Sequence, residues 1–205
     1  EQRWQAALEG AGEGVWDWNI ETGEVYFSPR LLEMLGYERR DFKGHISDWE
    51  QRVHPDDIGL AHHTLERYLA GELADYACEH RLRCKDGSYR WILDRGKVVS
   101  RTADGRPRRM IGTHADISAR KAAESQLTLV QAALQATPTG IVITDQAGCI
   151  EWVNPAFTVL TGYSAEEVTG QNPRVLRSGR HDARFYERMW RTISGGEVWR
   201  GEIFN

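Results

Sequence analysis

Two hydrophobic patterns alternate along the chain and predict its secondary structure. Residues 15–20 and 76–84 place apolar side chains at every second position, which is typical of half-buried β-strands. Residues 58–69 repeat apolar side chains at helical spacing, which predicts an amphipathic helix. Lys85-Asp86-Gly87 has the composition of a hairpin turn. The order of strand, strand, short helices, long helix and three strands predicts an α+β fold with an antiparallel sheet and helices on one face.

The same pattern returns 126 residues further along the chain. A repeat of this length indicates a duplicated domain, because solenoid repeats are only about 20–50 residues long. The second copy reaches only the start of its third strand, so we expect it to be incomplete at its C-terminus and the parent chain to continue. The matching segments are QAALEGAGEG (5–14) with QAALQATPTG (131–140), Ser28-Pro29 with Asn154-Pro155, Gly36-Tyr37 with Gly162-Tyr163, and Gly44 with Gly170.

Residues 114–140 predict one helix that joins the two copies. Asp116 can cap its start, and Pro138 ends it. We therefore divide the chain into a first domain (1–119), a helical linker (120–136) and a second domain (137–205). The linker either packs on its own domains or forms a parallel homodimer helix that carries a signal, and we favour the dimer. The apolar residues that repeat at spacings of 4, 3 and 4, as in a heptad seam, are Ala123, Leu127, Val130 and Leu134.

Composition removes several classes of function. The net charge of −4 and the pI near 6.0 argue against binding to nucleic acid or to an anionic membrane. Three cysteines without a CxxC spacing favour a reducing compartment. No apolar run approaches the roughly 18–20 residues that span a bilayer, so we expect this segment to be cytoplasmic. This expectation leaves open a membrane anchor elsewhere in the parent protein. Phosphate-loop, nucleophile-elbow, kinase and zinc signatures are absent from the sequence, and we expect no active site.

Several motifs together resemble PAS sensor domains with their PAC segment. These are the W…RVHPDD stretch (49–57), the KDG hairpin (85–87) and the closing Asp-Ile-Ser (116–118), which is usually Asp-Ile-Thr in that family. The resemblance covers essentially the whole chain and implies two PAS folds in tandem. Loops such as GQNPRVLRSGRHD (170–182) resemble those upstream of GGDEF and EAL cyclic-di-GMP enzymes and of sensor histidine kinases. This resemblance implies that the chain is a sensory input module whose output domain lies elsewhere in the parent protein.

The second copy also resembles flavin-binding PAS domains. In those relatives the positions that match Asn172 and Arg174 contact the ribityl and phosphate groups, and those that match Trp190 and Asn205 lie near the flavin ring. The resemblance implies FAD as the cofactor, since an amide bonds hydroxyls and a guanidinium grips phosphate. Pro173 stands where photoreceptors place their reactive cysteine, so thiol photochemistry is not expected. The alternative interpretation makes Asn172 a turn residue, Arg174 a solvated side chain and Trp190 a core residue.

The histidines of the first domain offer weaker candidates. His62 lies on the apolar face of its predicted helix, where haem-binding PAS domains carry their iron ligand. A lone histidine there is more often a hydrogen-bonded core residue, and we favour that interpretation over haem. His54, Asp56 and Asp57 fit the start of a helix better than a metal site. Two functions remain open: a sensor of a small ligand or redox state that relays through the helical linker, and a cofactor-free PAS scaffold for dimerisation.

Overall fold

The computed structural model describes residues 12–204, and it divides into two compact units, Glu1–Ser125 and Gln126–Asn205. The boundary between the units falls inside the predicted linker helix. The first part of the predicted repeat, residues 5–11, and the predicted site residue Asn205 lie outside the described residues.

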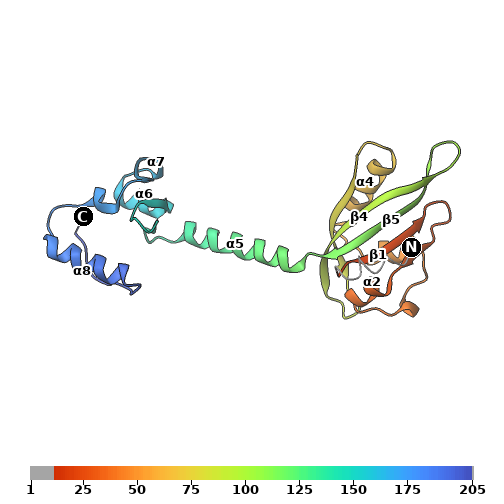
Figure 1. Cartoon of the computed structure of the whole chain (residues 1–205), viewed down its shortest axis with the longest axis horizontal. Helices are drawn as coiled ribbons and strands as arrows, with labels where there is room; N and C mark the ends of the chain where they lie inside the picture. Colours follow the sequence, from red (N-terminus) through yellow and green to blue (C-terminus); the bar gives the residue numbers. More distant parts are fainter. Residues whose placement is uncertain (1–11, 205) are drawn as a thin grey trace. The chain divides into compact units, whose positions relative to one another are not determined.

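A five-stranded antiparallel sheet forms the frame of the first unit (Figure 1). Its strand order is β2-β1-β5-β4-β3, so the last three strands pair in sequence and β5 closes onto β1. The predicted hairpin turns join neighbouring strands, and Gly87 takes the left-handed φ of +87° that its turn requires. The strands are β1 (Gly14–Asn19), β2 (Val25–Phe27), β3 (Tyr76–Arg83), β4 (Tyr89–Arg101) and β5 (Pro107–Asp116).

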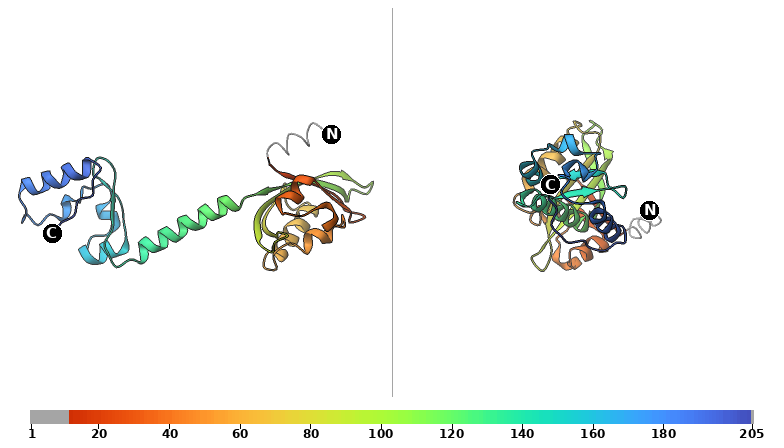
Figure 2. Two further views of the ribbon diagram at one scale, coloured as in Figure 1. Left: turned by 90° about the horizontal axis from the view of Figure 1, so that it is seen from below. Right: turned by 90° about the vertical axis from the view of Figure 1, so that its left-hand side faces the viewer.

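The helices of this unit gather on one side of the sheet (Figure 2). They are α2 (Pro29–Met34), the 3-10 helix η1 (Arg39–Asp41), α3 (Ile46–Glu50) and α4 (Ile58–Leu69). The α2 helix begins as its sequence predicts: the Ser28 hydroxyl accepts the Leu31 N–H, and Pro29 occupies the first turn. Together with the sheet this arrangement confirms the predicted α+β fold.

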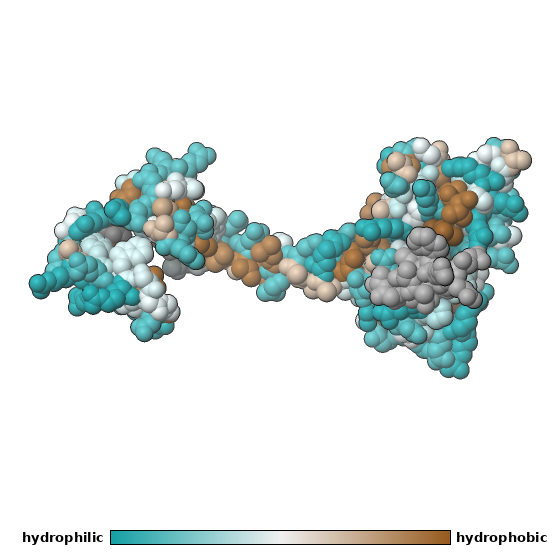
Figure 3. Space-filling model, viewed as in Figure 1, coloured by the Kyte–Doolittle hydropathy of each residue, from teal (hydrophilic) through white to brown (hydrophobic). Residues whose placement is uncertain are grey.

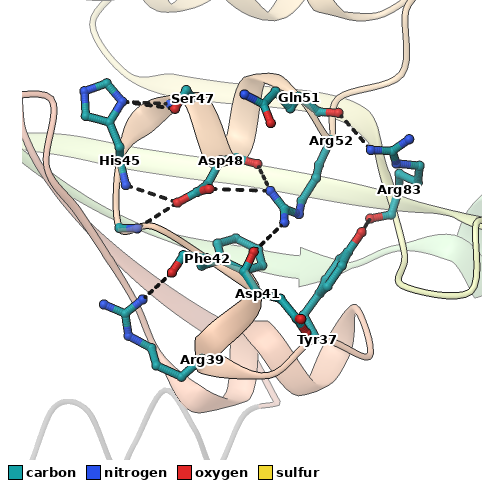
Figure 4. Close-up of polar contacts among 11 residues, drawn as sticks. Tyr37, Arg39, Asp41, Phe42, His45, Ser47, Asp48, Gln51, Arg52 and Arg83 are labelled. Carbon is teal, nitrogen blue, oxygen red and sulfur yellow. Dashed lines mark hydrogen bonds and ion pairs between the residues drawn. The ribbon is translucent and has the colours of Figure 1, made fainter.

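The core lies between the sheet and these helices. Strand β3 buries alternate side chains, as its two-residue period predicts. Arg52 fixes the loop between η1 and α3, because its guanidinium donates to the Asp41 and Asp48 carbonyls at 2.9 and 2.6 Å and lies 3.9 Å from the centre of the Phe42 ring (Figure 4). The largest apolar side chains of this unit that are almost completely buried are Leu31, Leu35, Leu82, Ile92 and Met110.

The predicted linker is a single helix, α5 (Ser118–Ala136). The Asp116 carboxylate accepts the Ser118 N–H at 2.9 Å, as predicted for the start of this helix. The helix ends two residues before Pro138. Its first turns are tied to the first unit, because Glu79 on β3 binds both Arg120 and Lys121.

The second unit repeats the first half of this fold at the same offset of 126 residues. Asn154 replaces Ser28 as the cap, and its side chain accepts the Phe157 N–H at 3.1 Å. Ser164 and Glu167 form the predicted capping box. The described part of the unit contains a two-stranded sheet. Its elements are β6 (Val142–Thr144), β7 (Ile150–Val153), α6 (Pro155–Thr161), α7 (Ala165–Val168), η2 (Pro173–Leu176) and α8 (Ala183–Ser194).

Candidate functional site

A groove of about 260 Å³ lies in the second unit between η2, α8 and the chain that follows α8. Ligand pockets usually begin near about 300 Å³, so the groove is slightly smaller than that range. It brings together three of the four cofactor-binding residues that the sequence predicts, Asn172, Arg174 and Trp190. Asn205 lies outside the described residues. The remaining lining residues are Pro173, Leu176, Arg177, Tyr186, Met189 and Ile203.

Asn172 has a structural task at the edge of this groove. Its side-chain oxygen accepts the Arg174 N–H at 3.1 Å and caps η2. Its amide nitrogen donates to the Gly148 carbonyl at 3.0 Å, which ties η2 to the β6–β7 turn. An amide offers two N–H donors and two lone pairs, so Asn172 keeps one of each for a ligand.

Trp190 lies on α8 with its ring against the β6–β7 turn. Gly148 makes this approach feasible, because a Cβ there would lie 3.0 Å from the Trp190 ring and 3.1 Å from the Asn172 amide nitrogen. Its φ of +79° is a second reason for glycine at this position. The Trp190 side chain is 37% exposed, so the ring keeps a free surface for stacking.

Two further groups give the groove its polarity. The Arg174 side chain is exposed, and no contact fixes its guanidinium among residues 12–204. The Tyr186 hydroxyl is buried yet has no hydrogen-bond partner within the described part of the chain. An unpaired buried hydroxyl costs about 1–3 kcal/mol, which a ligand with a hydrogen-bonding group would recover. The residue type of Tyr186 does not show that its hydroxyl is unpaired; only the packing of α8 does.

The first unit has a much smaller cavity of about 30 Å³, room for a single water-sized molecule. Trp16, Trp18 and Trp49 line it, with Asp94 and His114 at its polar side. The candidate haem ligand His62 is not among its lining residues and instead pairs with Glu50 at 3.3 Å. The interior beside this cavity is filled by side chains and leaves room for about one water molecule, not for a ligand.

The acidic start of α4 differs in detail from the sequence prediction. Asp57 is the N-cap residue of α4, but its side chain makes no cap hydrogen bond. Its carboxylate instead accepts both the Nε–H and an Nη2–H bond of Arg81, at 2.8 and 2.7 Å. The side-chain hydrogen bond from Arg81 is the main cause that lowers the pKa of Asp57. Asp57 therefore locks α4 to β3.

Sequence reasoning missed a polar cluster in the first core. His80, Asp94 and His114 lie on neighbouring strands, all buried, with one nitrogen or oxygen of each within 4.8 Å of the others. The available signal was a charged residue, Asp94, on the same strand face as the apolar Ile92. Nothing in the local sequence shows which residues pair across the sheet.

Among the described residues, no helix has the length and apolar character needed to cross a bilayer.

Comparison with known proteins gives two matches to models of the PAS fold, over residues 24–114 and 128–204. The chain is 40% identical over 65 residues to a nitrogen fixation regulatory protein of Klebsiella pneumoniae, a match covering 32% of this chain and 13% of the relative. It is 25% identical over 205 residues to the sensor protein FixL of Bradyrhizobium diazoefficiens, covering 96% of this chain and 40% of the relative. The chain thus spans well under half the length of these curated relatives.

A solved structure gives the same result. A sensory box histidine kinase/response regulator from Burkholderia thailandensis is 34% identical, with a TM-score of 0.58, and the match covers 66% of this chain and 99% of that structure. The two family matches coincide with the two structural units, and the five-stranded sheet with helices on one side is the expected architecture. The chain therefore belongs to the PAS family and consists of two PAS sensory domains of the kind found in signalling proteins.

Proposed function

We propose that this chain is the sensory input part of a signalling protein, that its second PAS domain binds a flavin, FAD, in the groove between η2 and α8, and that α5 relays the state of the bound ligand. The observation that carries the proposal is the groove lined by Tyr186, whose buried hydroxyl is unpaired among the described residues, together with an unconstrained arginine and a half-exposed tryptophan. Such a combination of a flat apolar surface and a few convergent polar groups is typical of a small-molecule site.

The groups present fit a flavin in three ways. The free face of Trp190 suits a planar aromatic ring. The Arg174 guanidinium suits a phosphate, to which arginine can donate two parallel hydrogen bonds. The Tyr186 hydroxyl and the remaining capacity of Asn172 suit the polar edge and the hydroxyl chain of the cofactor. A bound flavin would supply redox chemistry, and the chain's own residues would hold and orient it.

Binding of FAD to the purified chain, followed by flavin fluorescence, tests this proposal. We expect saturable binding that weakens at least tenfold in Arg174→Ala, because a phosphate contact is lost. The matched control is Arg188→Ala, on the same unit but outside the groove, which should bind like the unaltered protein. Equal affinity in the unaltered chain and both variants, or no binding in any of them, would refute flavin binding in this groove.

The relay part of the proposal depends on α5. Leu127 and Val130 of the predicted seam are 61% and 43% exposed, and apolar patches lie along this helix (Figure 3). Exposed apolar side chains on a heptad seam, such as those of Leu127 and Val130, are stabilised by a second copy of the same helix. We therefore propose a parallel homodimer through α5, in which a change in the groove favours one of two helix arrangements.

Sedimentation tests the dimer. Replacing both Leu127 and Leu134 with Gln should convert the dimer to a monomer, because both residues lie on the seam. The control replaces Leu129, which is 64% exposed but lies off the seam, and should leave the mass unchanged. A monomeric unaltered chain would refute the intermolecular seam.

A second candidate function is a cofactor-free scaffold for dimerisation. The structural use of Asn172 favours it, since both bonds of its amide serve the fold. A chain that dimerises but takes up no FAD would support the scaffold, and one that binds FAD supports the sensor. In either case we propose a cytoplasmic, non-catalytic input segment whose output domain, a cyclic-di-GMP enzyme or a histidine kinase, lies elsewhere in the parent protein.

A further inference from the structure

The polar cluster in the first PAS domain lies on the face of the sheet that the helices cover. His80 comes from β3, Asp94 from β4 and His114 from β5, and they are 1%, 4% and 2% exposed. Asp94 pairs directly with His114 across β4 and β5, while its partner on β3 is Cys78, two residues from His80. The pairing of the three strands thus assembles the cluster from residues that are far apart in the sequence.

Asp94 is held as a carboxylate. It accepts the Trp16 indole N–H at 2.8 Å and the Tyr76 hydroxyl at 3.0 Å, and His114 Nε2 lies 3.3 Å away. Burial alone would raise the pKa of Asp94, but the charge of His114 and the hydrogen bonds from His114 and Tyr76 outweigh it and lower that pKa. A buried negative charge therefore stands beside two imidazole rings.

The two imidazoles have different hydrogen-bonding states. The Trp49 indole N–H donates to His80 Nε2 at 3.1 Å, so that nitrogen carries a lone pair and the proton of neutral His80 is on Nδ1. His114 directs Nε2 at the carboxylate. The Nδ1 atoms of both histidines are buried and have no partner within residues 12–204. The cluster is thus incompletely satisfied, which is costly in a core.

A divalent metal ion would use the same three side chains, but the hydrogen bond from Trp49 argues against it. A metal at Nδ1 of His80 would require the ring proton on Nε2, where it would face the Trp49 N–H. A metal at Nε2 would have to displace Trp49 altogether. A proton at Nε2 also ends the Trp49 hydrogen bond, but it leaves the Nδ1 proton in place and needs no further ligands.

We propose that His80, Asp94 and His114 form a proton-binding site through which the first PAS domain senses acidity. Nε2 of His114 lies 3.3 Å from the Asp94 carboxylate, and a hydronium ion supplies the sensed proton to Nε2 of His80. Burial and the charge of His114 lower the pKa of His80 to about 4, against the opposing effect of Asp94, so this proton binds only on acidification. The site is independent of the flavin groove.

Uptake of this proton by His80 changes one specific contact. Protonated His80 has N–H groups at both ring nitrogens, so it can no longer accept from Trp49. The indole of Trp49 must then leave its place in the core, and with it α3 loses a contact to β3. Next to His80, Glu79 on the other face of β3 binds Arg120 and Lys121 of α5. A shift in β3 therefore has a direct route to the first turns of the linker helix.

Other titratable groups surround the cluster and define the controls. Burial raises the pKa of Tyr76 and brings that of Cys78 to about 11, so both stay neutral in acid. Asp57 at the start of α4 stays ionised through its bond with Arg81. His62 on α4 is the main competitor, since its ring lies 5.8 Å from that of Trp49 and its other neighbour is Glu50 on α3.

Nuclear magnetic resonance of the indole N–H groups in the full chain tests the proposal. Trp49→Phe identifies the Trp49 signal, and the signal is followed from pH 7 to pH 4. We expect it to move in one titration step as its acceptor is lost, to stay constant in His80→Gln, and to titrate normally in His62→Gln. A glutamine oxygen can accept from the indole but takes up no proton in this range.

Three results would overturn the proposal. They are a Trp49 signal that does not move while the chain stays folded to pH 4, an unchanged titration in His80→Gln, and a titration that disappears in His62→Gln. If His80→Gln does not fold, the ¹⁵N signals of the His80 ring in the unaltered chain decide, and they must titrate together with Trp49. Stoichiometric Zn²⁺ binding at pH 7 that protects the His80 ring would assign the cluster to a metal instead.

Discussion

The two PAS domains share one chain path and differ in what they enclose. Helix α4 of the first domain buries Ala61 completely against the sheet, and the cavity beside it holds about 30 Å³. Helix α8 occupies the matching position 126 residues later, has no buried residue, and borders a groove of about 260 Å³. Part of this difference follows from the sheet, because α4 packs on a five-stranded sheet, whereas the described part of the second unit has a two-stranded sheet and leaves α8 more exposed.

The loop before the long helix shows how the difference arises. In the first domain Ile46 and Trp49 of α3 line the small cavity and help to close it. The positions 126 residues later are Asn172 and Val175, and Asn172 lines the groove with its amide. An isoleucine fills space with apolar surface, whereas an amide at an open edge keeps hydrogen-bonding capacity. At this position the first domain therefore has an apolar side chain against its cavity, and the described part of the second unit has an amide at its groove.

The largest expected difference in stability is between a substitution in the core of the first domain and one in the groove of the second. Ile92→Ala in the first domain should lower the free energy of unfolding by about 4 kcal/mol, because Ile92 is fully buried and a cavity would remain. Met189→Ala on α8 should cost about 1 kcal/mol, since Met189 lines an open groove. Hydrogen exchange read separately for peptides of each domain measures both. Equal costs would show that the second interior is packed like the first.

Acid should destabilise the first domain more than the second. The pKa of His80 is lowered from 6.5 to about 4, so between these values the unfolded chain binds a proton that the folded chain does not. Stability is therefore complete above pH 6.5 and falls as the pH falls, by about 3 kcal/mol at pH 4.5. Carboxyl groups with lowered pKa, such as Asp94, add their loss only at lower pH. Hydrogen exchange of β3–β5 should show this loss, and His80→Gln should remove it.

A smaller effect compares the two caps, Ser28 and Asn154. The Ser28 hydroxyl accepts from Val15 and Leu31. Asn154 accepts two such bonds and also donates to the carbonyls of Thr139 and of Leu134 at the end of α5. Asn154→Ser keeps the shared bonds and loses the donated ones, so we expect a cost of about 1 kcal/mol. Faster amide exchange should follow in the last turn of α5, and an unchanged α5 would contradict its anchoring by Asn154.

The sequence predicted those features that local chemistry determines. The two-residue period of β3 and the cap of α5 at Asp116 both depend on neighbouring residues, and the structure confirms them. Asn172 and Arg174 lie two residues apart, so one motif was enough to place both at the groove. The flavin role of these residues stays a prediction.

Features that depend on long-range pairing were out of reach. Asp94 and His114 are ordinary strand residues until β4 and β5 pair and place them opposite each other. The state of the Tyr186 hydroxyl likewise depends on how α8 packs, and its residue type alone does not reveal it. The side chain of Asp57 was expected at the start of α4, but Arg81 across the fold offers it a stronger, charge-assisted partner.

One titration tests the contrast between the domains most directly. The chain has eight tryptophans, distributed over both domains, so the indole N–H signals report on each interior in a single spectrum. On addition of FAD, we predict a saturable shift of the Trp190 signal, with those of Trp16 and Trp49 unchanged. No shift at Trp190, or a shift of the Trp16 and Trp49 signals instead, would contradict a second domain open to a flavin beside a first domain closed to it.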